Sequence, residues 1–235
     1  MTSPMKALNA TEHKNVKIKQ ELHIEGTKNQ QVLPLLVHEF AKAGSAMPVI
    51  FIRPSEEDKN VVQPASLLGL KPEENLFYKD GKWVGEYLPA VVTHHPFAMV
   101  PTQGEENRLQ MLINESSPLV NDADGDALFD GEEQTDYLKN RMESLSNYFG
   151  SMQVTREFCD HLVQKELLIE QTLSVEINGE KVQLNGLLLV DEKKLSEMSD
   201  EDYLVLRQRG FLAPIYAHLG SLHHANKLAK LRAEA

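Results

Sequence analysis

The stretch that decides the fold is Gln171-Thr-Leu-Ser-Val-Glu-Ile-Asn178-Gly179-Glu-Lys-Val-Gln-Leu-Asn-Gly-Leu-Leu-Leu-Val190. Before Asn178, apolar residues alternate with polar ones, and the alternation resumes after Gly179. Such a period of two is typical of a strand with one buried face. Asn-Gly is the preferred pair for a two-residue type I′ turn. The stretch therefore predicts a long β-hairpin.

Strand signals also dominate the first half of the chain. Val49 to Arg53 is a short apolar run that indicates a buried strand, and Lys17 to Glu25 alternates loosely. Leu35 to Ala43 reads as a short helix that begins after Pro34 and is stopped by Gly44. Two further antiparallel pairs are expected: 75–78 with 83–87 around an Asp-Gly turn, and 97–101 with 108–114 across the polar segment 102–107.

Helix signals dominate the second half. Leu138, Met142, Leu145 and Phe149 form an amphipathic stripe, and Gly150-Ser151 is expected to separate this helix from a second one that carries Val154, Phe158 and Leu162. A third helix is expected from Ser199 to Gly210, and Pro214 opens the last.

We therefore predict a single α+β domain. Antiparallel sheets in the N-terminal half and a central hairpin would pack against four to five helices, mainly in the C-terminal half. Residues 1–16 are predicted to be a flexible N-terminal segment and residues 17–235 the folded domain. The alternative is two lobes that meet near 116–136.

Composition limits the compartment and the partners. The chain has 235 residues, of which 41% are hydrophobic and 25% charged, and it has a single cysteine, Cys159. No apolar stretch approaches the roughly 20 residues that span a bilayer, and no signal peptide is visible, so a soluble cytoplasmic protein is expected. The net charge of −11 disfavours nucleic acid as a partner.

One acidic segment follows the spacing of a calcium-binding loop. Its sixth position, where such a loop needs glycine, is Ala127, and no helix signal precedes it. We therefore favour a solvated acidic loop, with calcium as the alternative. The candidate calcium ligands are Asp122, Asp124, Asp126, Asp130 and Glu133.

No motif for a nucleophile, a metal or a cofactor occurs, so no cofactor is predicted. If the protein is an enzyme, Glu115 is the candidate general base and His218 the candidate acid, provided that the fold brings them together. The alternatives are a turn role for Glu115 and a packing role for His218. Trp83, Phe97 and Tyr216 are candidate binding residues, although large aromatic residues usually belong to the core.

Ordered blocks along the chain resemble the bacterial SapC family. They include Glu39-Phe40, Gly81-Lys-Trp83, Tyr87-Leu-Pro-Ala90, His95-Pro-Phe97, Ile113-Asn-Glu-Ser-Ser-Pro118 and Ile215-Tyr-Ala-His-Leu219. The resemblance runs from about Val32 to Leu231. His95 departs from it where an aromatic residue is usual, and Asn114 where aspartate is usual.

The resemblance implies an association with bacterial surface layers and no catalytic residues. It also implies neighbours in the genome: outer-membrane nutrient receptors, halogenase-like flavoproteins and cupin-like proteins. The permease label that some members carry conflicts with the lack of a membrane span. The favoured interpretation is an accessory or binding protein with a protein partner or a second copy of itself. The alternatives are an enzyme that modifies a small molecule or peptide, and a surface-layer component exported by a non-classical route.

Overall fold

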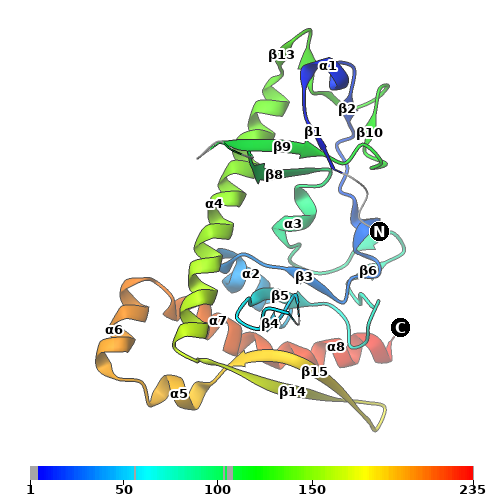
Figure 1. The fold of residues 1–235 in the computed structure, drawn as a ribbon. Coiled ribbons are helices and arrows are strands. Elements are labelled where there is room, and N and C mark those ends of the chain that lie inside the picture. Colours follow the sequence, from blue (N-terminus) through cyan, green and yellow to red (C-terminus); the bar gives the residue numbers. More distant parts are fainter. Residues whose placement is uncertain (1–4, 56, 103, 105–107, 235) are drawn as a thin grey trace. The chain divides into compact units, whose positions relative to one another are not determined.

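A computed structural model describes residues 5–55, 57–102, 104 and 108–234, and it has the predicted α+β fold with antiparallel sheets (Figure 1). Residues 1–4 of the predicted flexible segment, and residues 103 and 105–107 of the predicted polar loop, lie outside the described residues. The chain forms two compact units. Unit 1 comprises residues 1–23 and 92–151, and unit 2 comprises residues 24–91 and 152–235. The predicted domain boundaries remain predictions.

Unit 1 is built from short strands around an apolar core. Its sheets have the strand orders β1-β9-β8, β10-β2-β11 and β12-β13. Its core holds Ile18, Phe97, Ile113, Leu128 and Leu138. The elements are β1 (Lys6–Ala7), α1 (Ala10–His13), β2 (Lys17–Ile18), β8 (Phe97–Pro101), β9 (Leu109–Ile113), β10 (Val120–Asn121), β11 (Asp126–Ala127), β12 (Phe129–Asp130) and β13 (Glu133–Gln134).

The strands of unit 2 form one five-stranded antiparallel sheet of order β14-β15-β4-β5-β3, together with the small hairpin β6-β7. Leu188 of β15 pairs with Phe51 of β4, so the C-terminal hairpin joins the strands of the first half. The strands are β3 (Val32–Pro34), β4 (Val49–Ile52), β5 (Gln63–Leu67), β6 (Tyr78–Lys79), β7 (Lys82–Trp83), β14 (Leu168–Ile177) and β15 (Glu180–Val190).

Helices of unit 2 pack on this sheet: α7 contacts β4 and α2, and α8 contacts β14. Phe40, Phe51, Phe158 and Ile215 are fully buried in the resulting core. The elements are 3-10 turns at Ile24–Thr27, Val37–Glu39 and Leu222–His224, and α2 (Phe40–Gly44), α5 (Glu192–Ser196), α6 (Asp200–Gln208), α7 (Leu212–Ser221) and α8 (Ala225–Ala233). Helices α3 (Ala90–Thr93) and α4 (Asp136–Gln164) contribute residues to both units.

The hairpin predicted from residues 171–190 is confirmed. Strands β14 and β15 are joined by Asn178 and Gly179, both with positive φ as a type I′ turn requires. The Asp-Gly hairpin and the pair of 97–101 with 108–114 are confirmed as well, as β6-β7 and β8-β9.

Three predicted element boundaries are wrong. Pro214 does not open the last helix, because α7 begins at Leu212 and α8 follows it. Gly150 does not separate two helices, because α4 runs unbroken from Asp136 to Gln164. A glycine inside a helix costs only about 1 kcal/mol of helix stability. Burial of Leu145 and Phe158, which lie on either side of Gly150, stabilises the helix by more than that. The strand expected over 17–25 is reduced to β2, since Leu22 is 53% exposed and a 3-10 turn begins at Ile24.

Candidate functional site

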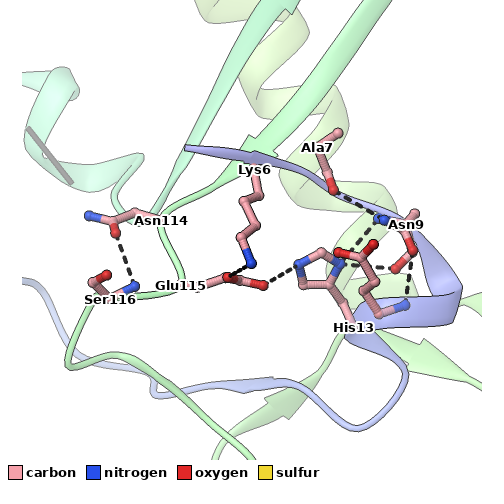
Figure 2. Close-up of polar contacts among 8 residues, drawn as sticks. Lys6, Ala7, Asn9, His13, Asn114, Glu115 and Ser116 are labelled. Atoms are coloured by element: carbon pink, nitrogen blue, oxygen red, sulfur yellow. Dashed lines mark hydrogen bonds and ion pairs between the residues drawn. The ribbon is translucent and has the colours of Figure 1, made fainter. Parts of the chain in front are cut away.

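A cluster of charged side chains gathers in unit 1, where β1, the end of α1 and the loop after β9 meet. Figure 2 shows Lys6 and His13 each directed at a different oxygen of the Glu115 carboxylate. Nζ of Lys6 lies 2.6 Å from Oε2 of Glu115, and Nε2 of His13 lies 3.3 Å from Oε1. The hydrogen bond from Lys6 lowers the pKa of the Glu115 carboxyl, so this group is a carboxylate at neutral pH.

Local structure fixes the histidine of this cluster. Asn9 caps α1, because its Oδ1 accepts a hydrogen bond from the backbone N–H of Glu12 at 2.9 Å. Nδ1 of His13 lies 3.0 Å from the backbone carbonyl oxygen of Asn9 and 3.2 Å from the backbone nitrogen of Asn9. The His13 side chain is 1% exposed, and within the described chain its Nε2 has no hydrogen-bond partner. The buried ring therefore presents an unsatisfied nitrogen to a carboxylate.

Glu12 completes the cluster. One ligand atom each from Glu12, His13 and Glu115 lie within 4.8 Å of one another, and among the described residues these three form a group with the spacing of metal ligands. On the loop after β9, Oδ1 of Asn114 accepts a hydrogen bond from the Ser116 N–H, which shapes the backbone around Glu115. The sequence indicated Glu115 but missed Lys6 and His13, because no motif spacing links residues that lie so far apart in the chain.

Glu115 and His218, the predicted acid–base pair, each have partners within their own unit. His218 is fully buried in unit 2. Its Nδ1–H donates to the Val49 carbonyl at 2.8 Å, and its Nε2 accepts from the Val190 N–H at 3.1 Å. Burial lowers its pKa to about 4. Because both ring nitrogens bond backbone groups of β4 and β15, His218 pins two neighbouring strands.

The three candidate aromatic residues differ in exposure. Phe97 belongs to the core of unit 1, with the Arg141 guanidinium 5.9 Å from its ring centroid. Trp83 stacks on Phe77 and donates from Nε1 to the Tyr87 carbonyl at 2.9 Å. Tyr216 is 53% exposed, so it is the candidate that offers most of its ring to a partner.

Tyr216 lines a groove of about 670 Å³ formed by α5, α6 and α7 of unit 2. The neighbouring Tyr203 hydroxyl raises the pKa of Tyr216. The segment 191–202, which forms one wall of the groove, has six carboxylates and two lysines. The groove therefore combines two exposed rings with negative charge. Its lining is Glu192, Lys193, Leu195, Ser196, Met198, Asp200, Tyr203, Tyr216 and Leu219.

Two other hollows are more polar in their lining. One of about 700 Å³ lies against the five-stranded sheet of unit 2, where Arg53 and Glu170 form an ion pair with a 3.5 Å N–O distance. The other, of about 520 Å³ in unit 1, is lined by residues of β9 and by Glu132, Gln134 and Met142. Neither contains an exposed aromatic pair of the kind formed by Tyr203 and Tyr216.

The candidate calcium ligands lie on a succession of tight turns and short strands. Asp126 belongs to β11 and Asp130 to β12, while Glu133 begins β13. The Asn121 side chain accepts from the N–H groups of Ala123 and Asp124, which fixes the first turn. None of these carboxylates belongs to the Glu12–His13–Glu115 group, and calcium binding remains a prediction.

Gly125 gives this acidic segment a structural role. Its φ is +106°, and a Cβ there would lie 2.1 Å from the carbonyl oxygen of Ile18 in β2. We expect Gly125→Ala to lower the free energy of unfolding by about 2 kcal/mol, measured by urea denaturation. Gly131→Ala is the matched control, since its φ is also positive but a Cβ would meet no atom within 4 Å. Equal losses in the two variants would refute the steric argument.

Glu39 is a buried carboxylate that sequence reasoning did not single out. It is 2% exposed in unit 2. Its Oε1 accepts from the Tyr87 hydroxyl at 2.6 Å and the Ala90 N–H at 2.8 Å, and its Oε2 accepts from the Leu36 N–H at 2.8 Å. Two of the blocks that carry the family resemblance, Glu39-Phe40 and Tyr87 to Ala90, therefore meet at one side chain.

The described residues form an α+β protein with three notable features. They are the buried His218 that bonds two strands, the charged cluster around Glu115, and the acidic groove that contains Tyr203 and Tyr216. A family model described as SapC matches residues 8–228 of the 235, so the chain belongs to the SapC family. The chain matches no curated protein and no solved structure at a significant level. Among the residues that the structure describes, no helix is both long and apolar enough to cross a membrane.

Proposed function

We propose that this SapC-family chain is an accessory protein that binds a partner protein through the groove of α5, α6 and α7. The observation that carries the proposal is the exposed pair Tyr203 and Tyr216, which are 36% and 53% exposed. Tyrosine is enriched at the energetic centres of protein interfaces, where one rigid ring buries a large area.

Charge indicates which partner segment fits the groove. Glu192 and Asp200 lie in its wall, and the surrounding segment 191–202 has a net charge of −4, from six carboxylates and two lysines. A partner segment with Lys or Arg beside an apolar residue complements both features. Such complementarity accelerates association and makes it sensitive to salt.

The family resemblance supplies the partners to test. Outer-membrane nutrient receptors, halogenase-like flavoproteins and cupin-like proteins are the candidates for a role in nutrient uptake, and surface-layer subunits for a role in surface-layer assembly. Cell fractionation narrows these candidates, because a cytoplasmic chain meets the flavoproteins and cupin-like proteins, whereas an exported chain meets outer-membrane receptors or surface-layer subunits.

The test measures binding of the chain to each purified candidate by biolayer interferometry. With a true partner, Tyr216→Ala is expected to weaken binding at least tenfold, which corresponds to about 1.4 kcal/mol, because it removes a ring from the centre of the contact. Raising the salt concentration should weaken binding further.

Val154→Ala is the control variant, since Val154 is 50% exposed on α4 and lies outside the groove. It should leave the affinity unchanged. A partner that binds wild type and Tyr216→Ala equally well would show that the groove is not the binding surface.

A further inference from the structure

We propose that Glu12, His13 and Glu115 form a binding site for a zinc ion in unit 1. One ligand atom from each lies within 4.8 Å of the others, from the end of α1 and the loop after β9. One imidazole and two carboxylates form a mixed nitrogen and oxygen donor set that suits Zn²⁺, with water in the fourth position. The proposal is independent of the groove in unit 2.

The buried histidine is the strongest argument for a cation. The His13 side chain is 1% exposed, and its Nε2 is 3.3 Å from Oε1 of Glu115 but not aligned for a hydrogen bond. An unsatisfied buried polar nitrogen costs about 1–3 kcal/mol. A cation between the nitrogen and the carboxylate removes that cost and attracts both groups.

The hydrogen bonds made by the other polar atoms of His13 and Glu115, those that would not bind the ion, suit metal binding. Nδ1 of His13 lies 3.0 Å from the Asn9 carbonyl oxygen and 3.2 Å from the Asn9 backbone nitrogen, whose N–H points at it. Zinc at Nε2 selects the ring form in which Nδ1–H donates to the carbonyl and the lone pair lies on Nε2. Metal-binding histidines commonly donate their other ring N–H to a backbone carbonyl in this way. Oε2 of Glu115 is held by Lys6 at 2.6 Å, which leaves Oε1 facing His13 (Figure 2).

Charge and distance are also compatible with Zn²⁺. Two carboxylates and the Lys6 ammonium leave the cluster with a net charge of −1, which a divalent cation reverses only to +1. Bonds of about 2.0–2.1 Å place tetrahedral ligand atoms about 3.4 Å apart. Nε2 and Oε1 are already at 3.3 Å, so the exposed Glu12 carboxylate is the group that must move inward.

The test is calorimetric titration of the full chain, freed of metal with a chelator, with Zn²⁺ alone. We expect one ion per chain at this site. Glu12→Gln should weaken binding at least tenfold, because it replaces a charged ligand with a neutral amide, and Glu12 is exposed enough for the fold to tolerate the change. His13→Gln should abolish binding, with circular dichroism to verify that the variant is folded.

Two controls separate this site from other zinc-binding groups. Asp124→Asn alters the acidic segment, and His223→Gln alters the neighbouring pair His223 and His224, so neither should change the affinity. In ¹⁵N spectra of the histidine rings, Zn²⁺ should shift Nε2 of His13 in the wild type. The proposal is overturned if wild type and Glu12→Gln bind Zn²⁺ equally, if no ion binds, or if the Nε2 resonance of His13 does not move.

Discussion

Replacing Glu39 with alanine is expected to lower the free energy of unfolding by about 4 kcal/mol, one of the two largest effects that we predict. The carboxylate accepts three hydrogen bonds, from the Leu36 N–H, the Ala90 N–H and the Tyr87 hydroxyl. The bond from Leu36 is buried, and those from Tyr87 and Ala90 are partly buried. Loss of an acceptor in a buried site costs about 1–3 kcal/mol for each bond, and water that enters the cavity recovers part of this loss.

The measurement is urea denaturation at neutral pH, with Glu157→Ala as the control because Glu157 is exposed on α4. Glu39→Gln should lose about 2 kcal/mol, since its amide nitrogen cannot accept from the donor that it faces. Burial and the hydrogen bond to Glu39 raise the pKa of Tyr87. Its hydroxyl therefore stays protonated, and remains a donor, at the neutral pH of the measurement. A loss below about 1 kcal/mol for Glu39→Ala would contradict the proposed role.

Acid is expected to destabilise the chain through His218. Burial lowers the pKa of this histidine to about 4 in the folded chain, against about 6.5 when it is unfolded. Between these values the unfolded chain binds the extra proton. The stability that depends on neutral His218 is therefore fully present above pH 6.5 and lost as the pH falls towards 4. The difference corresponds to about 3 kcal/mol.

The free energy of unfolding measured at several pH values between 7 and 4 checks this expectation. His218→Gln should be less stable than wild type at pH 7 but lose less stability on acidification, because its side chain does not titrate. His95, whose pKa burial also lowers to about 4, contributes in the same direction. His95→Gln is therefore the comparison variant, and it should retain the His218 part of the slope. Parallel pH profiles for wild type and His218→Gln would disprove the assignment.

Local chemistry predicted the parts of the fold that depend on neighbours in sequence. The Asn178-Gly179 turn and the alternation around it were sufficient for the hairpin, and Ser199 caps α6 as its position suggested. The break expected at Gly150 did not occur, because burial of side chains on both sides outweighs a small local preference. Leu22 shows the reverse: a residue that fits an alternating pattern is exposed when no strand pairs beside it.

The candidate site was less accessible to sequence reasoning. Glu115 was indicated, but its partners Lys6 and His13 lie about a hundred residues earlier, and nothing in a single sequence connects them. The same holds for Glu39 and Tyr87, which are 48 residues apart. Tyr216 was a candidate only as an aromatic residue, and its exposure became evident from the packing of α7. Phe97, from the same set, proved to be core.

The discontinuous make-up of the two units has a consequence for synthesis on the ribosome. The chain leaves unit 1 after His23, forms the first part of unit 2, and returns at Val92. Unit 1 has all its residues once Ser151 has emerged, whereas residues 24–91 must wait for the segment 152–235. During that interval Phe40 and Phe51 lack their later partners Phe158 and Ile215, so the nascent chain offers chaperones an apolar target in its middle.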